Sequence, residues 1–550
     1  MPAPAADRLA PLETRVVDHV FDARPNYAAS IGRHEFDGRL PDLSIEFTTR
    51  WSARTRQLLG DLRAVPDVEL TEPRRLDRQL LELLLEGALF DLEGVRELDR
   101  NPMSYLFQPD LTGYISRDYA PVAERVRAVA ATLSGVPALL ATARRRLEPV
   151  LARPFVTLGI QIGSGLPSHF AEGEAFAATG PAELRGDVRA AREAADSAVG
   201  EFVEWLKRER LPSADESFPL GLERFQRLLW VREGLTTPVD EVLRQGWADL
   251  RRNRARLDAI AAREGTTPSQ LIARLNDDHP KPAEIMPLVR NLTNDIREFV
   301  RRTDLASIPE PEVCHVRETP PWARDLWTAA LSPPGPFEKP VDGIYWVTTV
   351  DASWTPEQQE GWARTLNYAM LKNTTVHEVW PGHYLQALHF RRTEQSLARK
   401  VWFSYSFTEG WAHYCEQLAL EAGFDGGSMA AEVTELADAL TRNVRLVASI
   451  GLHTQGMRVE EATRLFQTEA FLEEFHAQRE AIRGTYNPEY FCYTLGKLAI
   501  LEVRAKYLGP KFGRSLRAFH DTLLGYGMPP IGLLDRLLAQ ASPPRGAGPS

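Results

Sequence analysis

Apolar residues recur at intervals of three and four along most of this 550-residue chain. The segments LDRQLLELLLEGALFDLEGVREL (76–98) and YAPVAERVRAVAATLSGVPALLATARRRLEPVLA (119–152) show the period clearly, with acidic residues and arginines between the apolar positions. This spacing predicts amphipathic helices that bury one face in a bundle. The same pattern predicts helices over 181–210, 238–264, 281–303, 356–376, 394–423, 428–450, 458–483 and 495–509.

Two segments break the helical period, and two further segments are expected to be loops. EVCHVRETP (312–320) and GIYWVTTVDASW (343–354) are short, rich in β-branched and aromatic residues and bounded by Pro and Gly. They are expected to be strands of one small antiparallel sheet, joined by a Pro- and Gly-rich surface connection. GIQIGSGLP (159–167) matches neither common phosphate-binding glycine motif and is expected to be a loop, as is GRHEFDG (32–38).

The length indicates more than one lobe, because single hydrophobic cores stop growing near about 250 to 300 residues. We place the division near residue 305, after a mainly helical first half. The expected parts are an N-terminal helical lobe (1–305), a second lobe (306–540) and a short tail (541–550). The tail is low in apolar residues and is expected to be frayed.

Composition narrows the possible partners and location. The chain is 43% hydrophobic and 25% charged, as in globular proteins, and its net charge of −10 offers no basic field for nucleic acid. Three scattered cysteines without CxxC spacing argue against a disulfide framework and a thiolate zinc site. The sequence shows neither a basic segment leading into an apolar run at its start nor about 18 uninterrupted apolar residues elsewhere. A cytoplasmic protein without a membrane partner is expected.

The segment TTVHEVWPGHYLQALHF (374–390) carries the most informative chemistry. In zincins, two histidines on a helix bind a metal and a Glu beside the first acts as general base. The usual interval between the histidines is four residues, whereas His377 and His383 are six apart, which leaves them about 120° out of line on a regular helix. The intervening Pro381 and Gly382 permit a kink or bulge that restores the alignment, with Glu378 as the base.

An alternative is that one helix ends at Trp380, a second starts at Pro381, and the two histidines are ordinary core residues. The segment FTEGWAHYCEQLALE (407–421) favours the metal, because a catalytic zinc site takes three protein ligands and leaves one position open. Glu409 is the preferred third ligand, and His413 and Glu416 are open alternatives. One Zn²⁺ is expected, although these ligand types also suit other divalent transition metals.

A tyrosine cluster and one more histidine are candidate hydrogen-bond donors to a reacting oxygen. GTYNPEYFCYTLGK (484–497) contains Tyr486, Tyr490 and Tyr493, and a phenol near a metal can donate to the oxyanion of a tetrahedral intermediate. His453, in LHTQG, is a further candidate. Core positions on amphipathic helices are the alternative explanation for the three tyrosines, and a capped helix end with a hydrogen-bonded imidazole is the alternative for His453.

With HEVWPGHYLQ and EGWAHYCE in place, the chain resembles the family called domain of unknown function 885, predicted metallopeptidases of the zincin class with HExxPGHxxQ and EGWAxYxE segments. The resemblance extends to GRHEFDGRLPDLS, WVTTVDASW, LHTQG, NPEYFCYTLGKL and FHDTLLGYGMPP. It implies a mainly α, multi-helix zincin-like fold with a central cleft, similar to thimet-type oligopeptidases and Taq-type carboxypeptidases. It also implies metal ligation by His377, His383 and Glu409, catalysis by Glu378, and an oxyanion or substrate role for Tyr490 and Tyr493.

The expected function is a zinc-dependent hydrolase, a peptidase that cleaves short peptides by metal-activated water with Glu378 as general base and then acid. The strand at 343–350 is expected to be the edge along which an extended peptide adds. A hydrolase of a small-molecule amide or ester is the first alternative. A catalytically silent metal- or peptide-binding protein is the second alternative. The presence of Glu378 argues against it, because a site used only for binding does not need a base at that position. The sequence indicates neither oligomeric state nor direction of cleavage.

Overall fold

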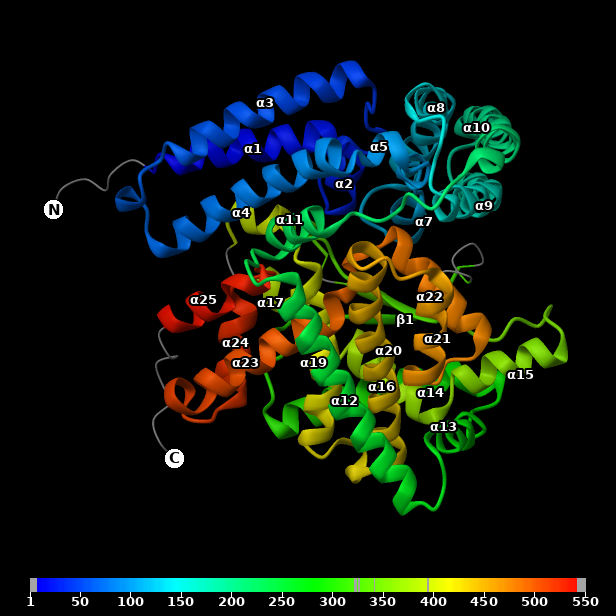
Figure 1. Cartoon of the computed structure of the whole chain (residues 1–550). Coiled ribbons are helices and arrows are strands. Elements are labelled where there is room, and N and C mark those ends of the chain that lie inside the picture. The colour runs from blue at the N-terminus through cyan, green and yellow to red at the C-terminus, as the bar shows by residue number, and fades with distance from the viewer. Residues whose placement is uncertain (1–6, 321–323, 325–326, 341, 393–394, 542–550) are drawn as a thin grey trace. The chain divides into compact units, whose positions relative to one another are not determined.

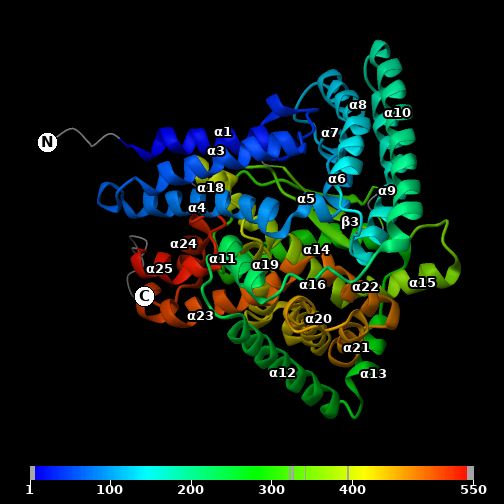
Figure 2. The same ribbon diagram turned by 45° about the horizontal axis from the view of Figure 1, so that its top comes forward.

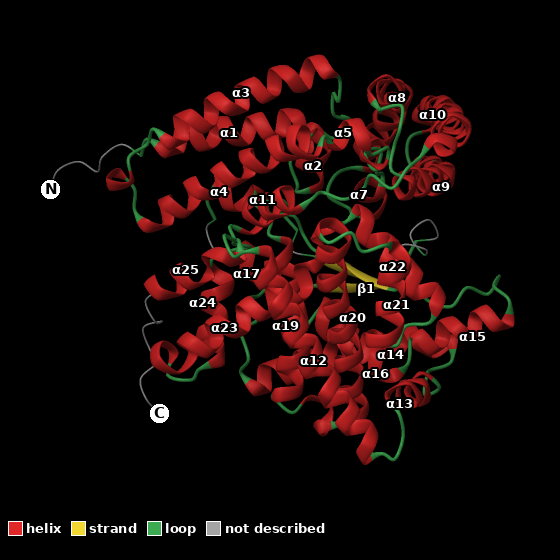
Figure 3. Cartoon of the chain, in the orientation of Figure 1, coloured by secondary structure: helices red, strands yellow, loops and turns green. Residues whose placement is uncertain are grey.

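The computed structural model describes residues 7–320, 324, 327–340, 342–392 and 395–541. The described chain is mainly helical, with one three-stranded sheet, as the red helices and yellow strands of Figure 3 show. It divides into two compact units. Unit 1 comprises Met1–Leu220, Gly335–Pro340 and Ser396–Trp402, and unit 2 comprises Gly221–Pro334, Val341–Gln395 and Phe403–Ser550. The prediction of a mainly helical fold is confirmed.

Unit 1 is built from helices. They are α1 (Leu9–Ala23), α2 (Pro25–Ser30), α3 (Ile45–Arg63), α4 (Glu72–Leu89), α5 (Glu97–Arg100), α6 (Met103–Leu106), α7 (Thr112–Ser116), α8 (Val122–Arg146), α9 (Arg153–Ala177), α10 (Arg185–Trp205) and α18 (Leu397–Val401). Helices α8, α9 and α10 pack side by side (Figure 2). Their apolar faces form a core that includes Val126, Leu133, Phe170, Val199 and Phe202.

The segment 159–167 lies inside α9, so its assignment as a loop was wrong. Its glycines serve helix packing. A Cβ at Gly163 would come within 2.6 Å of the Val203 side chain, and one at Gly159 would meet Pro102 at 3.0 Å. The absence of side chains therefore lets neighbouring elements approach α9 closely, and this gain outweighs the low helix propensity of glycine.

Helix α8 is long and apolar enough to cross a membrane, judged by length and composition alone. Half of its most apolar window is buried inside the protein, and a core helix meets the same criterion. Its Val129, Val136 and Leu140 belong to the core of unit 1. We therefore describe α8 as a core helix.

The GRHEFDG segment holds residues 335–340 within unit 1. The two ring nitrogens of His34 lie 3.2 Å from Asp37 Oδ1 and 3.3 Å from Glu338 Oε2, and the ring stacks on Tyr119 with centroids 3.7 Å apart. A Cβ at Gly32 would overlap the backbone of Glu338, so the two segments meet backbone to backbone.

Unit 2 carries the sheet and the remaining helices. The helices are α11 (Leu222–Glu233), α12 (Val239–Arg263), α13 (Pro268–Asn276), α14 (Pro282–Thr303), α15 (Pro356–Thr365), α16 (Tyr368–Glu378), α17 (His383–Arg392), α19 (Tyr405–Glu421), α20 (Met429–Thr454), α21 (Val459–Ala470), α22 (Glu474–Tyr486), α23 (Cys492–Phe512), α24 (Leu516–Gly525) and α25 (Leu534–Gln540). Figure 1 shows them coloured along the chain. Helix α20 packs against α12, α16, α21, α22 and α23.

Four predicted helices, 76–98, 356–376, 394–423 and 458–483, each contain two α-helices in the structure. The breaks fall at N-terminal caps or at a left-handed residue. Asn367 accepts a hydrogen bond from the backbone of Met370 to start α16, and Ser404 accepts one from Phe407 to start α19. Phe471 has a φ of 58° and ends α21. The spacing of apolar residues by three and four continues through these points, which is why periodicity alone predicted continuous helices.

The sheet has the strand order β1-β3-β2 and lies in unit 2. Strands β1 (Cys314–Glu318) and β3 (Gly343–Val347) confirm the two predicted strands, but they pair in parallel. The connection between them contains a third strand, β2 (Ala329–Ser332), which pairs antiparallel with β3. The sheet is therefore mixed, and the prediction of an antiparallel sheet was wrong. Since β3 is the central strand, residues 343–347 cannot be the edge that receives a peptide.

The boundary between the units also differs from the one predicted. The chain leaves unit 1 between Leu220 and Gly221, so residues 221–305 belong to unit 2 and not to an N-terminal lobe. Of the predicted tail, residues 542–550 lie outside the described residues. All three cysteines are free, as the lack of a disulfide pattern predicted.

Candidate metal centre

The chain between the two motif histidines makes a complete break in the helix. Helix α16 ends at Glu378 and α17 starts at His383, with a cis peptide bond between Trp380 and Pro381. The structure thus has two separate helices, as in the alternative considered from the sequence. The two histidine rings nevertheless face each other, with centroids 4.8 Å apart and planes at 87°.

Gly382 makes this turn possible. Its backbone N–H donates to the carbonyl of Val376 at 3.1 Å, and a Cβ at this position would overlap the carbonyl of His377. Only glycine fits against the last turn of α16, since it carries no Cβ. The close approach brings His383, the next residue, beside His377.

Helix α19 presents Glu409 to the two histidines. The indole of Trp411, two residues further along α19, donates to the carbonyl of Pro381 at 2.9 Å and so ties this helix to the turn. On the other side, a Cβ at Gly410 would overlap the backbone of Gly496, so α19 and α23 are in backbone contact beside Glu409. The carboxylate is therefore held by packing on both sides of its helix.

The side chains of His377, His383 and Glu409 form one cluster whose potential ligand atoms all lie within 4.8 Å of one another. Glu409 Oε2 lies 3.4 Å from Nε2 of His377 and 3.5 Å from Nε2 of His383. A tetrahedral ion with ligands at about 2.1 Å separates its ligand atoms by about 3.4 Å. These two distances therefore suit a shared metal ion.

The chemistry of this donor set also fits a cation. Glu409 Oε2 is buried and has no hydrogen-bond partner among the described residues. Burial opposes the charge on Glu409, but the two histidines outweigh this effect and hold its pKa well below the usual range. Burial likewise lowers the pKa of His377, yet Glu409 and Glu416 raise it to about 10. The carboxylates thus favour positive charge at the position where an ion would bind.

Glu416 and His413, the alternative third ligands, lie behind His377. Glu416 Oε1 accepts from Nδ1 of His377 at 2.6 Å, which directs Nε2 toward Glu409. Nδ1 of His413 lies 3.4 Å from the second oxygen of Glu416. A carboxylate that orients a ligating histidine is a common outer partner of metal sites. The geometry therefore favours Glu409 as the third member of the cluster.

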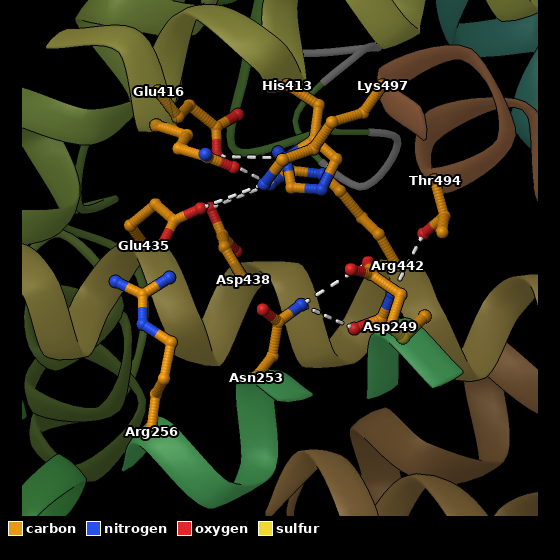
Figure 4. A network of polar contacts seen from close by, with 12 residues as sticks. Asp249, Asn253, Arg256, His413, Glu416, Glu435, Asp438, Arg442, Thr494 and Lys497 are labelled. Atoms are coloured by element: carbon orange, nitrogen blue, oxygen red, sulfur yellow. Dashed lines mark hydrogen bonds and ion pairs between the residues drawn. The ribbon is translucent and has the colours of Figure 1, made fainter. Parts of the chain in front are cut away.

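A buried network holds Glu416 (Figure 4). The guanidinium of Arg442 donates to Glu416 at 2.8 Å and lies 3.5 Å from Asp438. Although burial opposes ionisation of Glu416, the charge of Arg442 and the contacts with His377 and His413 keep its pKa well below the usual range. Lys497 donates to Glu435 at 3.0 Å in the same interior. Glu416 is therefore fixed in its ionised form before any metal binds.

Of the four predicted catalytic residues, Glu378 and Tyr493 lie beside this cluster. Glu378, at the end of α16, is buried, and its charge acts on Cys314 of β1 and Tyr345 of β3, so its carboxylate is on the sheet side. Tyr493 is near Glu409, because burial and the charge of that carboxylate raise its pKa to about 12. Its phenol therefore stays protonated at neutral pH and can donate.

Tyr490 and His453 interact elsewhere. Nε2 of His453 donates to the carbonyl of Gly484 at 2.8 Å, and burial lowers the pKa of this histidine to about 4. The hydroxyl of Tyr490 is also adjacent to Gly484, since a Cβ there would overlap it. Both side chains thus pack on the last turns of α22, and neither is brought into the cluster around Glu409.

Tyr405 is a candidate that the sequence reasoning missed. It lies one turn before Glu409 on α19, and the charges of Tyr493 and Glu409, added to the effect of burial, raise its pKa. Its spacing of four residues from Glu409 places it on the same face of the helix. That spacing was visible in the sequence, and it could have identified Tyr405 once Glu409 was chosen.

Comparison with known proteins identifies the family of this chain. The family model described as bacterial protein of unknown function, DUF885, matches residues 25–538. The chain belongs to this family. The family resemblance predicted from the motifs is thereby confirmed, whereas the zincin assignment and the likeness to thimet-type oligopeptidases remain predictions. No curated protein matches the chain.

Two solved structures share the fold of this DUF885 protein. A candidate lipoprotein of unknown function from Shewanella oneidensis is 24% identical, with a TM-score of 0.80 over 98% of this chain and 100% of the other. A candidate lipoprotein from Colwellia psychrerythraea is 17% identical, with a TM-score of 0.78 over 96% of this chain and 98% of the other. At these identities the likeness shows the fold alone.

Proposed function

We propose that this chain is a zinc-dependent hydrolase that cleaves short peptides. The observation that carries the proposal is the cluster of His377, His383 and Glu409, with ligand atoms within 4.8 Å of one another and Glu378 adjacent in the chain. Two histidines and one carboxylate are the ligand set of many catalytic zinc sites, which keep a further position open. When bound, the ion would polarise the substrate carbonyl and lower the pKa of water.

Glu378 is the proposed general base and acid. Its carboxylate takes a proton from water as the water oxygen adds to the carbonyl carbon. As the C–N bond breaks, Glu378 gives that proton to the leaving nitrogen, so the products are a carboxylic acid and an amine. Tyr493 and Tyr405 are the proposed donors to the oxyanion, since both phenols remain protonated near Glu409.

An extended peptide needs an outer strand, and β2 is the strand we propose for it. Strand β2 lies at one side of the sheet, and it packs against α16, which carries His377 and Glu378. Main-chain hydrogen bonds to such a strand would align the substrate. A structure with a peptide hydroxamate is expected to show the peptide beside residues 329–332, and a peptide bound away from them contradicts this part of the proposal.

The first test is metal content per chain, measured by emission spectroscopy on protein purified without chelator. We expect about one zinc in the wild type and in His476→Ala, which removes an exposed histidine of α22, but none in His377→Ala. Absence of metal from the wild type would contradict the proposed metal site and therefore the whole proposal.

Substitution of Glu378 distinguishes catalysis from silent binding. We expect Glu378→Gln to keep zinc and to lower turnover roughly 10²- to 10⁴-fold. A screen of peptides together with small amides and esters identifies the bond. If Glu378→Gln behaves as the wild type in every assay, the binding-protein alternative is favoured.

Location is a separate proposal. The free cysteines agree with a reducing compartment, whereas the names of the two structural neighbours suggest export of those proteins. A cytoplasmic location therefore has weaker support than the metal site. Fractionation of the native cell tests it directly.

A further inference from the structure

Three arginines surround Tyr493 next to the proposed metal centre, and two of them, Arg445 and Arg483, have no role in the mechanism so far. Arg442 and Arg445 are one turn apart on α20, and their guanidinium carbons lie 5.6 and 5.0 Å from the centroid of the Tyr493 ring. Arg483, in the last turn of α22, interacts with the hydroxyl of Tyr493. The Tyr493 side chain is thus surrounded by positive charge.

The packing of α23 connects this cluster to the metal centre. Tyr493 is at the start of α23, one turn before Gly496, and a Cβ at Gly496 would overlap the carbonyl of Ser406 on α19. Backbone contact between the helices at this point brings the first turn of α23 close to Glu409. The charges of both Glu409 and Arg483 act on the Tyr493 phenol. Tyr493 therefore lies within reach of the metal centre and of Arg483.

The carboxylates nearby are shared unevenly among the three arginines. Arg442 is held by Glu416 at 2.8 Å and lies 3.5 Å from Asp438. Arg445 donates to both oxygens of Glu480, each at 2.8 Å. Arg483 approaches Glu480 only to 3.9 Å, which is beyond hydrogen-bonding distance, and in the described part of the chain no other carboxylate lies within 4.0 Å of it.

Arg483 is also the more accessible of the two arginines beside Glu480. Its side chain is 28% exposed, compared with 14% for Arg445. Because Glu480 already accepts two hydrogen bonds from Arg445, Arg483 has no carboxylate of its own within hydrogen-bonding distance among the described residues, and a partly buried cation of this kind favours an anionic ligand. The planar fork of arginine suits a carboxylate in particular, because two N–H groups can donate to its two oxygens.

We propose that Arg483, positioned by Tyr493 and Glu480, binds a carboxylate of the peptide substrate, and that this group is the free C-terminal carboxylate. The inference rests on the proposed peptidase function. It makes the enzyme a C-terminal exopeptidase, since a carboxylate fixed beside the metal centre places the bond near the end of the chain at the reacting position. Hydrolysis consumes one water and yields a shortened peptide with a new carboxylate and a small amine-bearing product.

The binding test uses three peptides of one neutral sequence: the free acid, the C-terminal amide, and an amide that carries one Glu side chain. Calorimetry on zinc-loaded Glu378→Gln protein measures their affinities without turnover. We expect the free acid to bind most tightly. The additional change Arg483→Met should weaken the free acid roughly ten- to hundredfold and leave the plain amide unchanged. The affinity of Arg483→Lys for the free acid should lie between those of the protein with Arg483 and of Arg483→Met.

Arg479→Met is the matched control, because Arg479 is one turn earlier on α22 and lies over the exposed Phe475 ring. It removes the same charge from the same helix and should leave affinity for the free acid within about twofold. Circular dichroism of each variant verifies that the fold is retained. Equal binding of acid and amide, or equal weakening of both by Arg483→Met, overturns the inference. Tighter binding of the Glu-containing amide than of the free acid overturns the assignment to the C-terminus.

Kinetics separate this inference from the proposed function. With Glu378 intact, the free acid should be cleaved near its C-terminus, and Arg483→Met should raise KM for it more than it lowers kcat. Cleavage of acid and amide with equal kcat/KM overturns the inference while the hydrolase proposal stands. If no peptide is cleaved, the proposed function fails, and the calorimetric comparison still tests whether Arg483 binds a carboxylate.

Discussion

Glu416 decides which nitrogen of His377 faces the ligand cluster. Nδ1 of His377 donates to Glu416 at 2.6 Å, so Nε2 is the nitrogen that faces Glu409 and the one that would bind an ion after losing its proton. The ionised state of Glu416 depends on Arg442, which donates to its other oxygen at 2.8 Å. A single carboxylate thus sets the tautomer, the orientation and the basicity of one proposed metal ligand.

We therefore expect Glu416→Gln to weaken zinc binding roughly ten- to hundredfold, because a neutral amide orients the imidazole less strongly and makes it less basic. Competition with a coloured chelator measures the affinity. Glu421→Gln, on the exposed part of the same helix, should bind zinc as the wild type does. An unchanged affinity in Glu416→Gln would show that Glu416 has only a structural role.

At the residue scale the sequence predicted the cluster but not what surrounds it. His377, Glu378 and His383 follow from a local motif, and Glu409 follows from the need for a third ligand. The role of Glu416 depends on a contact across 39 positions of the chain, and no local pattern indicates which carboxylate on α19 faces the ion and which faces His377. Tyr490 and His453 were selected for their chemistry, and packing places them on Gly484.

At the scale of elements, the turn between α16 and α17 depends on one glycine. The N–H of Gly382 bonds to the carbonyl of Val376, and its Cα side faces the carbonyl of His377 without room for a methyl group. Any side chain here must push α17 away from α16. Because His383 is the first residue of α17, this movement also separates the ligand cluster.

Gly382→Ala is expected to lower stability by about 1 to 3 kcal/mol, as overpacking usually does, and to abolish stoichiometric zinc binding. Urea denaturation and metal content measure the two effects. Gly361→Ala in α15 is the control, because nothing lies within 4 Å of a Cβ there and the change should be neutral or stabilising by about 0.5 to 1 kcal/mol. Full zinc content in Gly382→Ala would show that the turn can relax without moving His383.

Element prediction from the sequence succeeded where burial is one-sided and failed where context decides. Helices α8, α10, α12 and α14 follow from their apolar stripes. Strand β2 has only four residues in a Pro- and Gly-rich stretch, and its pairing with β3 identifies it. Segment 159–167 forms part of a helix because its neighbours pack against the glycines, and a single-chain propensity does not contain that information.

The contact of His34 with segment 335–340 should make stability depend on pH. Burial lowers the pKa of His34, but Asp37 and Glu338 outweigh it and raise the pKa to about 9, above the unfolded value of 6.5. A raised pKa contributes stability below about pH 6.5 that is lost as the pH rises through about 9. After allowance for solvent screening of this partly exposed group, we expect about 1 kcal/mol. Thermal unfolding from pH 6 to 10 should show the loss in the wild type but not in His34→Gln, and identical profiles would contradict it.

At the scale of the whole molecule, the path of the chain explains why the predicted boundary was misplaced. The chain leaves unit 1 after Leu220, returns at Gly335–Pro340 and again at Ser396–Trp402, and each return is short. The helices on either side of Leu220 have the same amphipathic pattern, so composition does not change there. Only contacts between distant segments, such as that of His34 with Glu338, reveal which parts form one unit.

All three proposed ligands belong to unit 2, and this predicts where zinc stabilises the molecule. A ligand that binds only the native form stabilises it by about 2.7 kcal/mol at a free concentration of 100 times Kd. Hydrogen exchange followed by mass spectrometry should therefore show zinc-dependent protection in α16, α17 and α19, with unit 1 unchanged. His377→Ala should show no zinc effect in either unit. Protection that appears equally in both units would mean either that zinc binds elsewhere or that the two units open together. The mutant distinguishes these cases. If zinc binds elsewhere, His377→Ala keeps the zinc-dependent protection, whereas if the units open together, His377→Ala loses it.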